Sequence, residues 1–211
     1  MDLYFSPLAC SMASRIALYE AGAAANFIEV DPKAKRTRDG VDYRTINPLG
    51  LVPALRINAG TVLLENAAIL QFIADRYPAA ALAPRDGLHR AQLQQWLSFI
   101  GTELHKALFV PLFDKALADT TKAKVLETGG QRLAYLERYL TGREFLLDAF
   151  SVADAYLLTV LNWNIATPVK LSSWPAIERY FARLKERPAI ARALKEEFAL
   201  YAEEQKRHKA A

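Results

Sequence analysis

Cysteine, histidine and long apolar runs are scarce in this chain of 211 residues, and each scarcity excludes a class of protein. Cys10 is the one cysteine, so the chain cannot form an internal disulfide and is not a disulfide-stapled scaffold. The three histidines are scattered, and no Cys/His spacing typical of zinc occurs, so we expect no metal site. No apolar run approaches the roughly 18 residues that a membrane-spanning helix needs. We therefore expect no membrane association.

The N-terminal residues lack the pattern of a secretion signal. Asp2 places an acid where a signal peptide carries positive charge, and no apolar core precedes a small-residue cleavage site. These features favour a cytoplasmic location.

The chain also lacks a long run of charges of one sign. The chain has 27 basic and 23 acidic residues, a formal net charge of +4. Residues 1–77 hold eight of each sign, so the basic excess lies beyond residue 77, where acids and bases alternate, as in 184–187 and 194–197. This alternation is typical of solvated helix faces. No basic run is interleaved with aromatic residues, so we expect no nucleic-acid partner.

The first third of the chain alternates strand-like and helix-like segments. Residues 2–5 predict a strand, 12–21 a helix and 26–30 a second strand, which together form a β-α-β unit. Turn residues at 58–61 separate two further strand candidates, 54–57 and 62–64, and an apolar helical stripe follows up to Tyr77. We expect a small mixed sheet with helices, and we read the polar stretch 32–42 as a connection.

The rest of the chain changes character after a proline-containing stretch. We predict an α/β domain over residues 1–77, a linker over 78–86 and an all-helical domain over 87–211. The helices expected in the second domain cover residues 88–118, 122–140, 152–164, 175–186 and 189–204. Ser151 and Asp154 form a capping box at the start of the third of these helices.

Cys10 lies between the first strand and the first helix. With Ser11 as the helix N-cap, its sulfur would lie near backbone N–H groups and the positive end of the helix dipole, which favour a thiolate. A free cysteine is more often a buried, inert residue. Because the chain has no second cysteine, any disulfide that it forms involves a thiol from outside.

Two other short segments have both a functional and a plain structural interpretation. A cis bond at Val52-Pro53 would leave the N–H and C=O of Val52 free to pair with an extended peptide, whereas a trans proline would simply begin an edge strand. At a helix start, Glu65 suits an ammonium group and the Asn66 side chain suits a carboxylate, but the pair also fits ordinary capping.

In this order, the segments resemble a cytosolic glutathione S-transferase of the bacterial beta class. The similarity covers essentially the whole chain. The residues that carry it are the strand-turn-Cys10-helix, Asn47 to Leu55, Leu64 to Asp75, Trp96-Leu97, Glu103 to Lys106 and Phe150 to Leu157.

The resemblance implies a thioredoxin-like N-terminal domain, an all-α C-terminal domain and glutathione as co-substrate. It implies catalytic roles for Cys10 and His105. It also implies glutathione-binding roles for Ser11, Lys35, Val52, Pro53 (in the cis form), Glu65, Asn66 and Lys106. Tyr4, Phe113 and Trp163 are candidate walls of a second-substrate pocket. Read without the resemblance, His105-Lys106 is a polar helix turn and the aromatic residues are core.

Three positions depart from the pattern of the class. Asn66 stands where serine or glycine is frequent, Arg15 where histidine is common, and Ser98 where asparagine is common. Asn66 should preserve anion binding. The other two bear on the hydrogen bonds around the thiol and across a dimer.

The expected function is glutathione transfer to hydrophobic small-molecule electrophiles, in detoxification. Cys10 would either stabilise the glutathione thiolate or form a mixed disulfide with glutathione. A non-catalytic glutathione-binding adaptor or regulator is the alternative on this fold, and a dehalogenase or isomerase would differ only in the second pocket. The family also implies a homodimer.

Overall fold

The computed structural model describes residues 1–210 and contains two compact units. The first comprises residues 1–83 together with the segment from Arg187 onward, and the second comprises residues 84–186. The C-terminal segment therefore packs with the α/β part of the chain. The domain ranges 1–77, 78–86 and 87–211 remain a prediction, because a compact unit defined by packing need not coincide with a domain.

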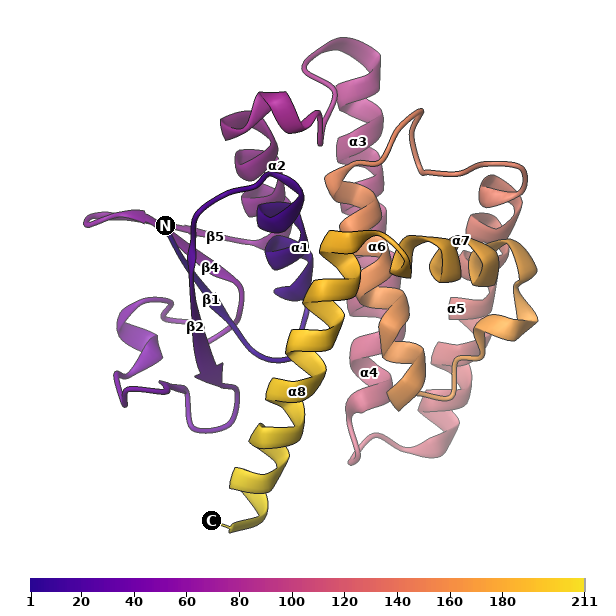
Figure 1. Ribbon diagram of the computed structural model, residues 1–211. Coiled ribbons are helices and arrows are strands. Elements are labelled where there is room, and N and C mark those ends of the chain that lie inside the picture. Colours follow the sequence, from indigo (N-terminus) through magenta and orange to yellow (C-terminus); the bar gives the residue numbers. More distant parts are fainter. Residues whose placement is uncertain (211) are drawn as a thin grey trace. The chain divides into compact units, whose positions relative to one another are not determined.

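The first unit contains a mixed sheet of five strands in the order β3-β2-β1-β4-β5 (Figure 1). The strands are β1 (Asp2–Phe5), β2 (Asn26–Asp31), β3 (Arg36–Thr37), β4 (Ala54–Asn58) and β5 (Thr61–Leu64). The central strand β1 pairs parallel with β2 and antiparallel with β4. The predicted mixed sheet is confirmed. The exception is β3, which lies in the stretch read as a connection and pairs antiparallel with the end of β2.

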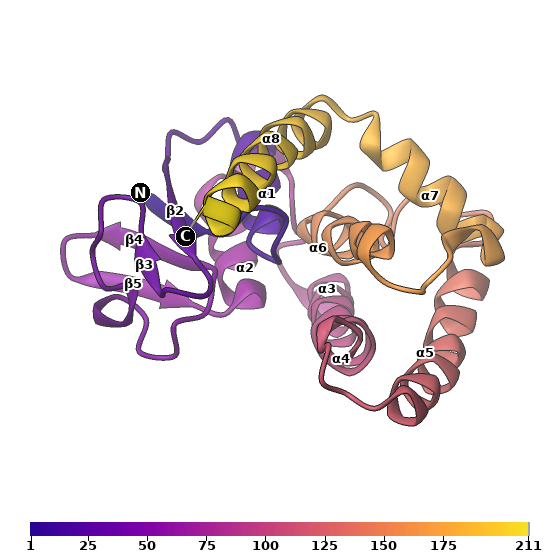
Figure 2. The same ribbon diagram turned by 90° about the horizontal axis from the view of Figure 1, so that it is seen from below.

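Alternation along β1 gives the sheet two apolar faces. Leu3 and Phe5 are buried, and so is Tyr4 between them. Tyr4 belongs to a core cluster with Val30, Tyr43 and Ala54. The helices α1 (Met12–Glu20) and α2 (Asn66–Arg76) pack against each other and lie on one side of the sheet in Figure 2.

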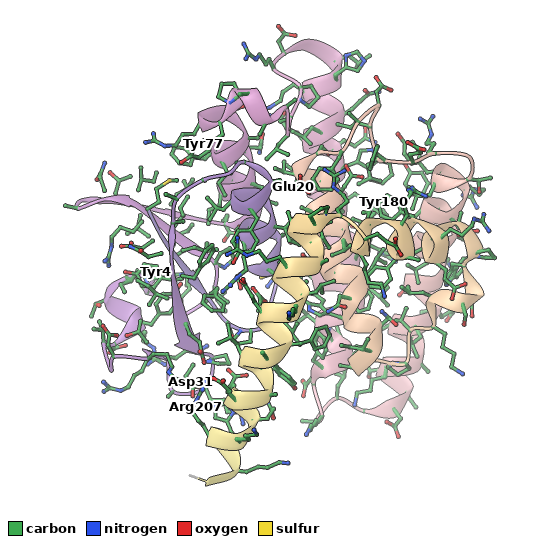
Figure 3. The ribbon with its side chains drawn as sticks, viewed as in Figure 1. Tyr4, Glu20, Asp31, Tyr77, Tyr180 and Arg207 are labelled. Atoms are coloured by element: carbon green, nitrogen blue, oxygen red, sulfur yellow. The ribbon has the colours of Figure 1, made fainter. Side chains whose placement is uncertain are left out.

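The long C-terminal helix α8 (Pro188–Ala210) packs on α1. Its Glu197 is fully buried, and one carboxylate oxygen accepts a 2.7 Å hydrogen bond from the backbone N–H of Leu8. The other carboxylate oxygen lies 3.0 Å from Nε of Arg15, whose guanidinium carbon lies 4.2 and 4.3 Å from the centroids of two phenylalanine rings. Near the end of the helix, His208 Nε2 lies 2.8 Å from a carboxylate oxygen of Asp31, and Figure 3 shows Asp31 beside the neighbouring Arg207.

The second unit is helical in the part of the chain that the structure describes. Its α- and π-helices are α3 (Gly87–Phe99), η3 (Ile100–Phe109), α4 (Val110–Phe113), α5 (Asp119–Leu140), α6 (Val152–Leu161) and α7 (Pro175–Lys185). Short 3₁₀ turns η4 (Asn162–Ala166) and η5 (Leu171–Ser173) follow α6. Every residue of α6 is buried, and this helix contacts α3, η3 and α7. The predicted helical half is confirmed.

Two local features of this unit bear on the sequence predictions. The capping box is confirmed: Ser151 N–H donates to Asp154 at 2.8 Å, and Ala153 N–H donates to the Ser151 hydroxyl at 3.3 Å. The expected helix 88–118 is instead three consecutive helices that end at Phe113, and its middle ten residues, η3, are π-helical. Hydrophobic spacing does not distinguish a π-helix from an α-helix, and π-helical segments are frequent at functional sites.

Candidate functional site

Cys10 lies in the short loop that connects β1 to α1, and its side chain is partly exposed. The thiol donates to the backbone carbonyl of Val52 at 3.3 Å, a normal distance for a sulfur donor. The Asn66 side chain donates to the Cys10 carbonyl at 3.2 Å. Three residues singled out from different parts of the sequence therefore meet at one place in the first unit.

Ser11 occupies the N-cap position of α1, as predicted, but its side chain makes no capping bond. The hydroxyl is fully buried and lies 3.3 Å from both the N–H and the carbonyl of Ser6. The amides of Met12 and Ala13 donate to the carbonyls of Ala9 and Cys10. The prediction that free amide groups face the sulfur was wrong for these two, because turns in the preceding loop use them.

The Val52-Pro53 bond is cis, as the resemblance implied. The preceding residue, Leu51, is held in place by two side chains that the sequence analysis did not single out. Its carbonyl accepts from Asn47 Nδ2 at 2.7 Å and from the Tyr43 hydroxyl at 2.9 Å. Burial raises the pKa of Tyr43 above its ordinary value, so this hydroxyl keeps its proton. The backbone just before Val52 is thus held by two side chains, those of Tyr43 and Asn47.

Glu65 and Asn66 begin α2, but with roles different from those predicted. Glu65, and not Asn66, is the N-cap residue, and its exposed side chain makes no capping bond. Asn66 is 7% exposed, and its Oδ1 accepts from the Ser14 hydroxyl at 2.8 Å. The Asn66 side chain therefore links α2 to α1 and to the Cys10 carbonyl. The exposed Glu65 carboxylate remains available for an ammonium group.

Lys35 is partly buried beside the same turn. Its ammonium group donates to the Gly50 carbonyl at 3.0 Å, two residues before Val52. A cation held there is placed to attract an anionic group near the turn.

Left-handed backbone conformations gather in these loops. Among residues 1–210, four non-glycine residues have positive φ: Leu8 (58°), Lys35 (55°), Glu65 (66°) and Ala81 (50°). Three of them, Leu8, Lys35 and Glu65, lie near Cys10 in the sequence or in the segments around Val52 and Asn66. Such conformations are disfavoured and tend to persist at functional sites.

Tyr4 is not a pocket wall. It is 2% exposed, and its ring packs against Tyr43, with centroids 5.7 Å apart, inside the core of the first unit. The alternative that a lone aromatic residue is core holds here, because Tyr4 points to the sheet face that Tyr43 covers.

Three of the other sequence-predicted residues, His105, Phe113 and Trp163, belong to one aromatic cluster in the second unit. His105, in η3, has its ring centroid 4.9 Å from that of Trp163, and the Trp163 centroid lies 5.6 Å from that of Phe113. Phe113 is 41% exposed, whereas Trp163 and His105 are each 8% exposed. The cluster thus has one open aromatic face, at Phe113.

His105 is held by a residue that the sequence analysis did not identify. Its Nδ1 lies 2.7 Å from the hydroxyl oxygen of Tyr156 in α6. Burial lowers the pKa of His105 to about 4, and the neighbouring Lys106 adds to this effect. The imidazole is therefore neutral at pH 7. Lys106 itself is exposed.

A cavity of about 420 Å³ lies elsewhere in the first unit, and none of the expected site residues lines it. It is bordered by Phe5, Arg15, Phe27, Ile28, Glu29, Arg38, Asp39, Leu200 and Glu203. Within residues 1–210, no group of three or more His, Cys, Asp or Glu side chains is arranged to hold a metal ion. No helix among the same residues is long and apolar enough to cross a membrane.

Comparisons with known proteins agree with this geometry. Residues 2–75 match the family model "Glutathione S-transferase, N-terminal domain", and residues 102–188 match "Glutathione S-transferase, C-terminal domain". Glutathione S-transferase GstA of Escherichia coli O157:H7 is 39% identical over 199 residues, which cover 93% of this chain and 98% of that protein.

Solved structures of relatives are similarly close. A sphingomonad glutathione S-transferase, solved in complex with glutathione, is 45% identical with a TM-score of 0.89 over 93% of this chain and 98% of its own. The beta-class enzyme of Sphingomonas chungbukensis is 44% identical, with the same TM-score and coverage. The thioredoxin-like domain followed by a helical domain is therefore confirmed. The chain belongs to the glutathione S-transferase family, and beta-class bacterial enzymes are among its close structural relatives.

Proposed function

We propose that this protein binds glutathione in its first unit and transfers the glutathione thiolate to hydrophobic small-molecule electrophiles. The observation that carries the proposal is the position of the Cys10 thiol, 3.3 Å from the carbonyl of Val52 at a cis-proline edge. An extended peptide that adds to this edge would bring its own backbone to Val52 and its cysteinyl sulfur to Cys10.

The charged ends of glutathione also have counterparts. The exposed Glu65 carboxylate suits the ammonium of the γ-glutamyl end, and Lys35 suits the glycyl carboxylate. Asn66 suits the carboxylate of the γ-glutamyl end, and its side chain also bonds the Cys10 carbonyl and the Ser14 hydroxyl. Ser11 likewise supports the loop from inside, because its hydroxyl is buried.

A second chemistry of the same thiol is exchange with glutathione disulfide. The Cys10 thiolate attacks one sulfur of that disulfide, forms a mixed disulfide and releases one glutathione thiolate. A second glutathione thiolate then attacks the bound glutathione sulfur, which restores Cys10 and regenerates glutathione disulfide. In conjugation, by contrast, Cys10 remains a thiol neighbour of the attacking glutathione sulfur.

In the second unit, His105 and Lys106 are the candidates for a polar contribution to the reaction. Trp163 and Phe113 supply the aromatic surface for an electrophile, with Phe113 as its exposed part. Following the family pattern, we also propose that the protein is a homodimer.

The variant Cys10→Ala separates the two roles of the thiol. The full chain and the variant are incubated with glutathione disulfide and weighed by intact-mass spectrometry, and both are assayed with glutathione and a chromogenic aryl electrophile. We expect the variant to form no glutathione adduct and to lose only part of its conjugating activity. An adduct in Cys10→Ala would overturn the disulfide assignment.

Retention on immobilised glutathione distinguishes an enzyme from a binding protein. Retention together with turnover supports the proposal, whereas retention without turnover of any electrophile or disulfide favours the adaptor alternative.

A further inference from the structure

His105 and Tyr156 form a tightly hydrogen-bonded pair inside the second unit. The hydroxyl oxygen of Tyr156, in α6, lies 2.7 Å from Nδ1 of His105, in η3. The two rings meet edge to face, with centroids 6.0 Å apart and planes at 88°. Tyr156 is 3% exposed and His105 8% exposed, so solvent competes little for this hydrogen bond.

The orientation of the imidazole is fixed from a second direction. The Trp163 ring also meets it edge on, with centroids 4.9 Å apart and planes at 70°. A flip of this imidazole would put Cδ2 in the place of Nδ1 and would lose the hydrogen bond with Tyr156. Nδ1 therefore faces α6, and Nε2 is the nitrogen left for other partners.

The direction of the hydrogen bond follows from the chemistry of the two groups. Burial lowers the pKa of His105 to about 4, so the ring carries one proton at pH 7. A phenol is a stronger hydrogen-bond donor than a neutral imidazole N–H, and an imidazole lone pair is a stronger acceptor than a phenol oxygen. The Tyr156 hydroxyl therefore donates to Nδ1, which puts the ring proton on Nε2.

We propose that Tyr156 is a positioning residue that holds His105 as the neutral tautomer with its proton on Nε2. This inference rests on the proposed function for its use: an Nε2–H group donates a hydrogen bond to an anionic group of a substrate and does not act as a base toward a thiol.

The imidazole nitrogens of the full chain, labelled with ¹⁵N-histidine, test the assignment without glutathione or turnover. The chain has three histidines, and His105→Gln assigns the signals of that residue. We expect a protonated Nε2 and an unprotonated Nδ1, unchanged between pH 6 and 8. A proton on Nδ1, or titration of the ring within this range, would overturn the inference.

The variant Tyr156→Phe tests the role of the hydroxyl. We expect its His105 signals to move toward the average of the two tautomers, kcat to fall about three- to tenfold, and KM for glutathione to stay within about twofold. Tyr139→Phe is the matched control, since it removes a partly buried tyrosine hydroxyl that donates at 2.8 Å to the Leu146 carbonyl in the same unit. This control should leave the His105 signals and kcat unchanged.

Two outcomes separate this inference from the proposed function. A chain that binds no glutathione but shows the expected tautomer would refute the proposed function and leave the Tyr156 assignment standing. Tyr156→Phe spectra identical to those of the parent chain would refute the positioning role even if the enzyme is active.

Discussion

Glu65 combines an exposed carboxylate with a backbone conformation that an L-residue rarely adopts. Its φ of 66° lies in the left-handed region, and its carbonyl accepts the N–H groups of Ala68 and Ile69 at the start of α2. Glycine tolerates such a conformation far better than glutamate. A disfavoured residue therefore occupies this position, which is typical of a site where function opposes stability.

The variant Glu65→Gly tests this opposition directly. We expect its unfolding free energy in urea to rise by about 0.5–1 kcal/mol, because the strain at φ 66° is relieved. We also expect glutathione to bind at least tenfold more weakly by calorimetric titration, because the carboxylate is lost. Glu65→Ala keeps the strain, so it should weaken binding without the gain in stability. Unchanged affinity in both variants would argue against an ammonium contact.

Residues whose roles depend on distant partners limited what the sequence alone predicts. Cys10, Val52, Pro53 and Glu65 could be singled out because each lies in a local pattern of turn, proline or helix start. The bonds of Asn66 to Cys10 and Ser14 could not be predicted, because they depend on how α1 and α2 meet. Tyr4 and Tyr156 are aromatic residues in apolar segments, and no local pattern shows which aromatic side chain will pack in a core and which will bond a histidine.

At the scale of elements, a buried carboxylate of α8, that of Glu197, bonds to the loop that carries Cys10. Glu197 accepts from the Leu8 N–H at 2.7 Å and lies 3.0 Å from Arg15 Nε, while the adjacent Glu196 lies 3.1 Å from Arg15 Nη1. Burial raises the pKa of Glu197 to about 8, with Arg15 and the Leu8 N–H opposing this shift.

This carboxylate should make stability depend on pH. Since its pKa is higher in the folded chain than in the unfolded one, the folded chain binds the extra proton between about pH 5 and 8. Its contribution to stability is full below the unfolded pKa and is lost as pH rises through about 8, by up to about 1.4 kcal/mol per pH unit. Urea denaturation of the parent chain and Glu197→Gln at pH 5.5, 7 and 8.5 measures it. The difference in unfolding free energy between the parent chain and Glu197→Gln should change with pH. A difference that stays constant would contradict the raised pKa of Glu197.

The start of α6 also depends on a buried carboxylate, that of Asp154. This fully buried carboxylate accepts from the Leu146 N–H at 2.9 Å, the Ser151 N–H at 2.8 Å, the Ser151 hydroxyl at 2.9 Å and the Tyr180 hydroxyl at 2.7 Å. Asp154→Ala would leave several buried donors without a partner. We expect it to lower the unfolding free energy by about 3 kcal/mol or more, against about 1 kcal/mol for Ser151→Ala. Chemical denaturation of both variants checks the order, and equal losses would show that the extra donors matter little.

Element boundaries were predictable to within one residue in β1, α1 and α7. The two-residue strand β3 was missed because a pair of residues in a polar stretch has no period. The π-helical form of η3 was missed because apolar spacing is nearly the same in α- and π-helices over ten residues. The grouping of α8 with the first unit depends on buried charges such as Glu197, which look like surface residues in the sequence.

At the scale of the whole molecule, the proposed homodimer is a statement about mass in solution. Light scattering of the full chain over a range of concentrations should give about twice the chain mass of 23.6 kDa. A monomer at every concentration would contradict the dimer. It would not contradict the proposed glutathione site, because Cys10, Val52 and Glu65 all lie in the first unit.

The central claim is that the edge at Val52, the Cys10 thiol and the Glu65 carboxylate form a glutathione site. A crystal structure of the full chain with glutathione tests it most directly. We predict that the cysteinyl backbone of glutathione pairs with Val52, that its γ-glutamyl ammonium faces Glu65, and that Cys10 is the residue of the first unit nearest its sulfur. Glutathione bound away from Val52, or with its sulfur pointing away from Cys10, would contradict the account.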